Sequence, residues 1–185
     1  PPLWPDFVCL SKGISGGYLP LSLVLTRDAV YEAFLDDDVA RGFLHSHSYT
    51  GNPLACRAAL AVLDRFEQDQ ALARNLEQAA ALSAALAPLA GDPRIEHFRQ
   101  RGMIWAFDVR EPFVGQRFAE RFHLAGRERG LLIRPIGRTV YLMPPYVLDD
   151  ALAQWLAEHL IATLNAVLGT EPSPHADRTP EPSTA

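Results

Sequence analysis

The chain has 185 residues, of which 48% are hydrophobic, so it is long enough to bury the core of one ordinary domain or of parts of two. Its formal net charge at pH 7 is -5, and because acidic residues and arginines are interspersed, no basic field favours a nucleic acid or an anionic membrane surface as a partner. No apolar run approaches the roughly 20 residues of a membrane-spanning helix, and residues 1–10 lack the features of a signal peptide, which makes a cytoplasmic location the default expectation.

Lysine occurs once in the chain. Sixteen of the 17 basic residues are arginine, and the exception is Lys12. A guanidinium stays protonated and cannot readily form an imine, whereas a lysine amine can lose its proton when it is buried. A single lysine is expected if one position requires an amine for its chemistry. A compositional bias toward arginine would explain the same count.

The two cysteines, Cys9 and Cys56, lie far apart in the sequence. They are too few for a disulfide framework, and their spacing does not suit a metal site. We therefore expect both to be reduced and buried as small apolar side chains.

The first predicted element is a short buried strand at residues 6–12, which runs into a glycine-rich loop at residues 13–17. The next predicted elements are a strand at 20–26, a short helix at 27–35 and a polar loop at 45–51. Asn52 and Pro53 then predict a helix start, because Asn can cap free amide groups and Pro fits the first turn. This helix is expected to end near Gln68.

A second apolar series with helical spacing runs over residues 72–89, and the turn residues at 91–93 end it. The later predicted elements are a strand at 102–109, a helix at 116–129, strands at 131–134 and 139–143, a helix at 148–169 and a disordered tail at 170–185. Strands and helices alternate, which favours α/β or α+β layers over a bundle or a sandwich. A change of structural unit is expected near residue 68.

Lys12 is predicted to lie where an open α/β sheet carries its reactive groups, at the carboxyl end of a strand, with glycines after it that leave room for a flat ring. A desolvated lysine there would be a nucleophile toward an aldehyde. An ordinary exposed lysine at a strand end is the alternative. The phosphate-loop motif is absent, and a Ser11–Lys12 nucleophile–base pair is disfavoured because neighbours on a strand point to opposite faces.

Residues 45–53, His-Ser-His-Ser-Tyr-Thr-Gly-Asn-Pro, hold a cluster of hydroxyl and imidazole side chains immediately before the helix that Asn52 caps. Hydroxyl groups beside a helix N-terminus suit a phosphate, because free N–H groups and the helix dipole both favour an anion. A metal site on the two histidines and a simple capping loop are the alternatives.

Arg134 stands between apolar neighbours and is expected to be partly buried, where a guanidinium needs a carboxylate partner. That partner could be an Asp or Glu of this chain or a bound substrate. His97, His123, His159 and His175 are expected to be structural or surface residues.

Taken together, three segments resemble the class III aminotransferases, which are pyridoxal-phosphate-dependent enzymes of fold type I. The segments are residues 10–20 around Lys12, residues 45–55, and Arg134 with the sequence Tyr-Leu-Met-Pro-Pro-Tyr at 141–146. Their order and spacing agree with the family, and the third segment is most similar to its biotin-synthesis members. The resemblance covers residues 5–168.

This resemblance implies roles for individual residues. Lys12 would hold the cofactor pyridoxal 5'-phosphate covalently and, once displaced by substrate, would move a proton. His47 and Ser48 would contact the cofactor, with Ser48 serving the phosphate in the active site of the other subunit of a homodimer. Ser46, Arg134 and Tyr141 would bind substrate, with Arg134 pairing with its carboxylate.

The implied reaction passes an amino group from S-adenosylmethionine to 8-amino-7-oxononanoate and yields 7,8-diaminononanoate. The resemblance also implies that residues 1–67 end the large cofactor domain and that residues 68–169 form most of a small α+β domain. Family members are more than twice as long as this chain, so the fragment alone is expected to be inactive. Another class III transaminase for an ω-amino acid or a diamine, and a noncatalytic dimerising module, are the alternatives.

Overall fold

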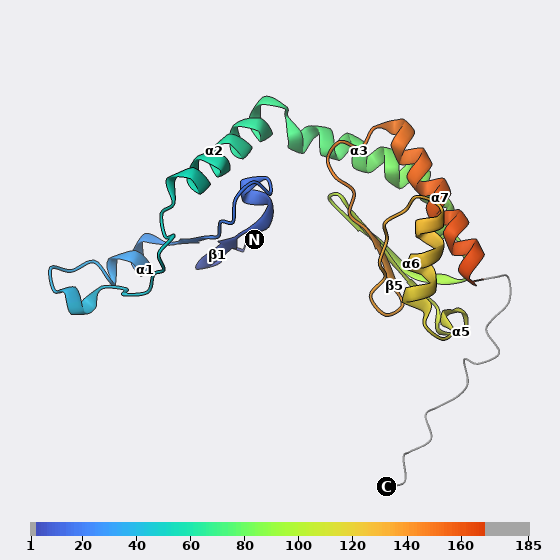
Figure 1. The fold of residues 1–185 in the computed structure, drawn as a ribbon, viewed down its shortest axis with the longest axis horizontal. Coiled ribbons are helices and arrows are strands. Elements are labelled where there is room, and N and C mark those ends of the chain that lie inside the picture. The colour runs from blue at the N-terminus through green and yellow to red at the C-terminus, as the bar shows by residue number, and fades with distance from the viewer. Residues whose placement is uncertain (1–2, 169–185) are drawn as a thin grey trace, which may run out of the picture. The chain divides into compact units, whose positions relative to one another are not determined.

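The computed structural model of the chain describes residues 3–168, so the predicted tail at 170–185, His175 and the predicted helix end at Gly169 lie outside the described residues. The chain divides into two compact units, one up to Ala71 and one from Leu72 onward (Figure 1). Within residues 3–168, no helix combines the length and the apolar character that crossing a membrane requires.

The first unit is built on a strand pair and a long helix. Its elements, in chain order, are β1 (Phe7–Leu10), the 3-10 helix η1 (Lys12–Ser15), β2 (Leu23–Thr26), α1 (Asp28–Glu32), the 3-10 helix η2 (Val39–Arg41) and α2 (Pro53–Gln68). Strands β1 and β2 pair antiparallel, with Phe7 opposite Thr26. Strands β1 and β2 and helices α1 and α2 were predicted, although β1, β2 and α1 are shorter than predicted, whereas the 3-10 helices η1 and η2 were not predicted.

Helix α2 begins as the sequence predicts. The side chain of Asn52 accepts hydrogen bonds from the backbone N–H groups of Leu54, at 3.0 Å, and Ala55, at 3.5 Å. Pro53 occupies the first turn, where its missing N–H leaves no bond unmade. The buried residues of the helix, Ala55 and Ala59, are small and four positions apart, and α2 packs against η1.

The strand pair of the first unit is more exposed than predicted. All four residues of β1 are exposed, Cys9 among them, and Cys56 on α2 is only half-buried. The predictions of a buried strand and of two buried cysteines are therefore wrong. The physical reason is that only two strands pair here, and no second layer of the described residues covers them.

The second unit is an α+β domain. Its elements, in chain order, are α3 (Ala71–Ala85), α4 (Ala87–Ala90), β3 (Ile95–Arg101), β4 (Ile104–Val109), α5 (Glu111–Val114), α6 (Phe118–Glu128), β5 (Thr139–Leu142) and α7 (Asp150–Leu168). The strands form one antiparallel sheet in the order β3-β4-β5. Helices α6 and α7 lie side by side next to this sheet (Figure 1).

One face of this sheet forms the core together with the helices. Alternate residues of β4 and β5 are buried, as a strand with one covered face requires: Trp105, Phe107, Val109, Val140 and Leu142. The helices contribute Leu82, Phe122 and Leu160, which are fully buried. The indole N–H of Trp105 donates to the hydroxyl of Ser83 on α3 at 2.9 Å, so its burial leaves no polar atom unpaired.

Four details of the second unit differ from the prediction. The single helix expected over residues 72–89 is divided at Leu86, because Pro88, in the first turn of α4, has no N–H to continue the hydrogen bonds of α3. Strand β3 and the short helix α5 were not predicted. Residues 131–134 are not part of a ladder, and only Ile136 makes an isolated bridge, to Thr139.

The face of the sheet that the helices do not cover carries polar residues, and many of them lie on β3. Glu96 on β3 accepts hydrogen bonds from Arg138 at 2.7 Å and from Arg110 at 3.1 Å. Asp108 on β4 accepts from the hydroxyl of Thr139 at 2.7 Å, and this bond holds the pKa of Asp108 below its usual value. Strand β3 is thus stabilised by the two arginine bonds to Glu96 and by the contact of His97 with Asp108 on β4, which hydrophobic periodicity does not detect.

Asp92 and Arg94 tie the turn after α4 to the last helix. Their side chains, at least 85% buried, form an ion pair of 2.6 Å, and Arg94 also donates to Asn165 on α7 at 2.6 Å. The hydrogen bond from Arg94 lowers the pKa of Asp92 below its usual value. A carboxyl group of this kind stabilises the fold above its unfolded-state pKa, near 3.8, and this contribution is lost as the pH falls through the lower folded-state pKa.

We therefore predict that the Asp92→Asn variant is less stable than the natural chain at pH 7, and that the difference shrinks as the pH is lowered below about 4. Urea unfolding followed by circular dichroism at a series of pH values measures it. Asp37→Asn removes an exposed carboxylate of the first unit and serves as the control. A difference that stays constant from pH 7 to pH 2 would contradict the linkage.

We also predict that the core of the second unit depends on α7. Leu160→Ala removes a fully buried side chain from the core and should lower the free energy of unfolding by about 2–5 kcal/mol. Leu124→Ala on α6, whose side chain is half-exposed, is the matched control and should cost far less. Urea unfolding of both variants provides the measurement, and equal losses would show that α7 is not packed as described.

Candidate active site

Strand β1 ends at Leu10, and Lys12, after one intervening residue, is the first residue of η1. The prediction of a strand that runs into a glycine-containing turn is confirmed, but Lys12 belongs to the turn and not to the strand. Its backbone has a φ of 55°, in the left-handed region that residues other than Gly rarely adopt. Its side chain is exposed, so the expected desolvation is not present in this chain. The immediate surroundings of Lys12 are one strand pair and one turn, which are too few groups to exclude water from its amine.

The loop before α2 is held by a turn centred on His47. The backbone N–H of His47 donates to the Thr50 hydroxyl at 3.1 Å, and the Nδ1 atom of His47 accepts from the N–H of Tyr49 at 3.1 Å. Ser46 and Ser48 are exposed, and their hydroxyls make no hydrogen bond to any residue in the range 3–168. These two hydroxyls are therefore available to a ligand, whereas the Nδ1 atom of His47 is occupied.

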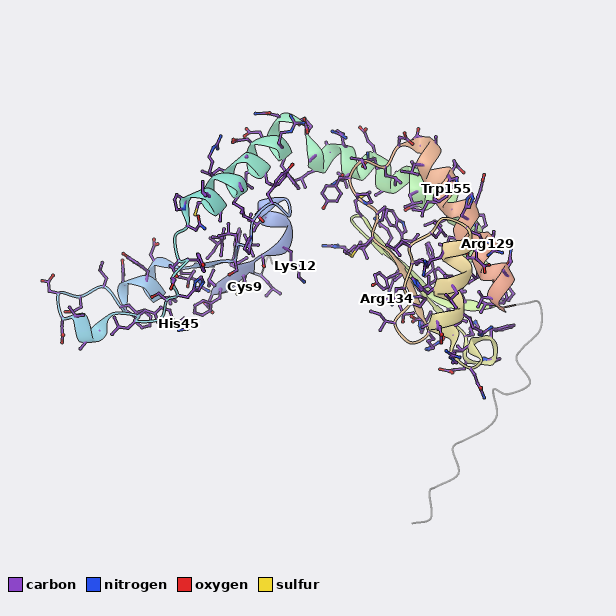
Figure 2. The ribbon with its side chains drawn as sticks, viewed as in Figure 1. Cys9, Lys12, His45, Arg129, Arg134 and Trp155 are labelled. Atoms are coloured by element: carbon purple, nitrogen blue, oxygen red, sulfur yellow. The ribbon has the colours of Figure 1, made fainter. Side chains whose placement is uncertain are left out.

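Figure 2 shows His45, the first residue of this loop, apart from Lys12. Within residues 3–168, no hydrogen bond or ion pair joins the side chain of Lys12 to His47 or Ser48.

Arg134 and Tyr141 share a cavity of about 430 Å³ in the second unit. The rest of the lining is almost entirely apolar and comes from residues 130–133, from the segment after β5 and from the start of α7: Gly130, Leu131, Leu132, Ile133, Leu142, Met143, Pro144, Pro145, Leu148, Leu152, Trp155 and Leu156. A cavity with one guanidinium, one phenol and apolar walls suits an aliphatic molecule that ends in a carboxylate.

Arg134 is exposed, so the prediction of partial burial is wrong. The alternation of buried and exposed residues along 131–135 explains this, because the buried side chains of Leu131 and Ile133 direct Arg134 to the other side. Within the part of the chain that the structure describes, the guanidinium makes no ion pair and no hydrogen bond. No internal Asp or Glu pairs with it there, and it is free to bind an anion.

One contributor to these sites was missed from the sequence. Trp155 lines the cavity, although its place in the apolar series of the last helix indicated only a core position. Thr50, a member of the predicted hydroxyl cluster, closes the turn at His47 by accepting a hydrogen bond from its backbone N–H.

The described histidines of the second unit, His97, His123 and His159, have structural contacts. His97 bonds Asp108 at 3.0 Å, His123 bonds the carbonyl of Ile133 at 2.8 Å, and His159 bonds the carbonyl of Trp155 at 2.8 Å. Over residues 3–168, no three or more His, Cys, Asp or Glu side chains are grouped so that they could hold a metal ion. The metal alternative for His45 and His47 therefore has no support from the described residues.

Comparisons with known proteins identify the family of this chain. The profile of the family Aminotransferase class-III matches residues 2–164. The adenosylmethionine-8-amino-7-oxononanoate aminotransferase of Helicobacter pylori is 45% identical over 153 residues, which are 78% of this chain and 34% of that protein. The enzyme of the same name from Synechococcus elongatus is 40% identical, over 81% of this chain and 35% of that protein. The chain thus spans about a third of the length of these curated relatives.

Solved structures give the same result. The adenosylmethionine-8-amino-7-oxononanoate aminotransferase of Methanocaldococcus jannaschii has a TM-score of 0.81 and 30% identity, and the match covers 89% of this chain and 39% of that one. An amine transaminase from an uncultivated Pseudomonas species, in its PLP-bound form, has a TM-score of 0.77 and 31% identity, over 88% of this chain and 39% of that one. The fold type I architecture expected from the sequence is therefore confirmed, and the chain belongs to the class III aminotransferase family.

Proposed function

We propose that this chain is the part of a pyridoxal-phosphate-dependent aminotransferase that supplies the cofactor lysine, Lys12, and the substrate-carboxylate arginine, Arg134. The proposed reaction transfers an amino group from S-adenosylmethionine to 8-amino-7-oxononanoate. Several relatives at 35–45% identity carry the name of this activity. The proposed assignment of the chain to the two domains of the family is residues 1–67 for the large domain and 68–169 for the small one.

The observation that carries the substrate proposal is the cavity around Arg134. Its guanidinium has no partner among residues 3–168, and a guanidinium binds a carboxylate through two parallel hydrogen bonds. The apolar walls beside it suit a methylene chain, which gains free energy when it leaves water. The phenol of Tyr141 offers a further hydrogen bond within the same cavity.

The surroundings of Lys12 fit a flat cofactor. A Cβ atom on Gly13 or Gly17 would meet nothing within 4 Å, so both sides of the turn are open. When bound, pyridoxal phosphate supplies the electron sink for the amino-group transfer. Lys12 would bind it through its amine and, once released, would take a proton from the substrate carbon and return it as a general acid.

We further propose that the chain acts in a homodimer, in which Ser48 and His47 of one subunit contact the cofactor phosphate held at Lys12 of the other. Two features support this. The hydroxyl of Ser48 is exposed and has no partner among the described residues. His45, at the start of the same loop, lies apart from Lys12 within one chain (Figure 2).

A second candidate is a class III transaminase for amines or ω-amino acids. The likeness to the Pseudomonas amine transaminase, at 31% identity, and to an (S)-enantioselective omega-transaminase of Thermomicrobium roseum, at 28%, favours it. An aliphatic diamine has no carboxylate for Arg134, so binding of 8-amino-7-oxononanoate but not of a diamine of similar length would rule out a diamine as the substrate.

The cofactor role predicts where pyridoxal phosphate becomes attached. After incubation with low concentrations of the cofactor and reduction with borohydride, mass spectrometry of peptides should find the label concentrated on Lys12, the only lysine in the chain. The amine at the amino terminus is the internal reference. Lys12→Arg keeps the positive charge but cannot form the bond, and it should abolish this label. Label confined to the amino terminus would contradict the assignment.

The substrate role predicts how the chain binds 8-amino-7-oxononanoate in calorimetry. Arg134→Gln should weaken this binding by about ten-fold, because a charged hydrogen-bonded pair is lost. Arg134→Lys should weaken it less, since the charge remains but the two-pronged geometry does not. Arg127→Gln on α6 removes an exposed arginine outside the cavity and should have no effect. Equal affinities for all four proteins would show that Arg134 does not hold the carboxylate.

A further inference from the structure

The left-handed backbone conformation of Lys12 must be stabilised by contacts with other residues. A residue with a Cβ atom pays a free-energy cost at a φ of 55°, and such conformations persist only where the surrounding structure enforces them. Because Lys12 itself is exposed, its own side chain does not supply this constraint. The constraint must come from the residues that follow it in the turn.

Ser15 is the buried residue of this turn and bonds to its backbone. It is 2% exposed, which is rare for a polar residue of the first unit, and its hydroxyl donates to the carbonyl of Leu19. The backbone N–H of Tyr18 donates to the carbonyl of Ser15 at 3.2 Å, and the N–H of Gly16 donates to that of Gly13 at 3.0 Å. The turn is therefore closed on itself, with Ser15 inside and Lys12 outside.

Gly16 is the point at which the turn meets α2. Its φ of 61° is left-handed, and a Cβ atom placed on it would lie 3.0 Å from the Cγ2 atom of Val62. Val62 follows Ala55 and Ala59 at helical spacing, so these three residues share the face of α2 against which η1 packs. Only a residue without a side chain allows the turn to come this close to the helix.

We infer that Ser15 and the contact between Gly16 and Val62 are the positioning elements for Lys12: they hold the turn against α2 so that the amine of Lys12 is presented outward to the cofactor. This inference rests on the proposed role of Lys12 as the cofactor lysine. It adds that α2 sets the orientation of Lys12 through the contact of Val62 with Gly16, which leaves no room for a side chain at position 16.

The test compares two glycines that share a left-handed backbone but differ in their surroundings. Gly16→Ala introduces both the backbone penalty and the contact with Val62, whereas Gly17→Ala, at a φ of 79°, introduces the penalty with nothing within 4 Å. The measurement is the concentration of pyridoxal phosphate that half-labels Lys12 upon borohydride reduction. Gly16→Ala should raise it roughly ten-fold more than Gly17→Ala does, because overpacking of a close contact displaces the turn.

The double variant Gly16→Ala/Val62→Ala provides the rescue. Removing Cγ2 of Val62 makes room for the new methyl group, so half-labelling should return to the level of Gly17→Ala. Val62→Ala alone loosens the contact without overpacking it and should raise the half-labelling concentration less than Gly16→Ala does. Circular dichroism of each variant verifies that the helices remain. Equal effects of Gly16→Ala and Gly17→Ala, or an excess that persists in the double variant, would overturn the inference.

A second measurement separates this inference from the proposed function. If pyridoxal phosphate labelled Lys12 of the natural chain no more than the amino terminus, the proposed cofactor role would fail. The position of the turn against α2 could still be followed by hydrogen exchange of the Tyr18 amide. Its bond to Ser15 should open more readily in Gly16→Ala and recover in the double variant. Unchanged exchange in Gly16→Ala would overturn the positioning.

Discussion

The register of β4 against β5 is the constraint on which the cavity of the second unit depends. Leu142 lies opposite Trp105, and Tyr141 lies opposite Ala106. Because side chains alternate along a strand, burying Val140 and Leu142 in the core directs Tyr141 to the opposite face. A slip of one residue would put the phenol into the core and a core side chain onto the open face, so burial of the apolar set keeps Tyr141 at the cavity.

The same alternation acts on the segment before β5, which makes no ladder of its own. Leu131 and Ile133 are buried, and Arg134 is turned outward to a cavity whose other walls are apolar. An arginine in this position keeps its hydration when the cavity is empty and exchanges water for a carboxylate when it is filled. The chemical character of the site thus follows from the packing of its apolar neighbours.

The first unit is organised differently, because few of its side chains are buried. Its order comes from a strand pair, from the Asn52 cap of α2 and from the close packing of η1 on the small-residue face of that helix. In solved relatives the matched part covers less than half of the chain. Lys12 is correspondingly placed by backbone geometry and not by burial.

The sequence by itself determined the features that depend on local interactions. The lone lysine after a short strand, the Asn-Pro start of α2 and the apolar face of α7 are readable because neighbouring residues decide them. Only the tertiary structure decided the rest: the polar strand β3, the division at Pro88, the exposure of Cys9 and Arg134, and the cavity that Arg134 shares with Tyr141 and Trp155. These depend on which distant segments pack together, and periodicity along one segment carries no information about its partner.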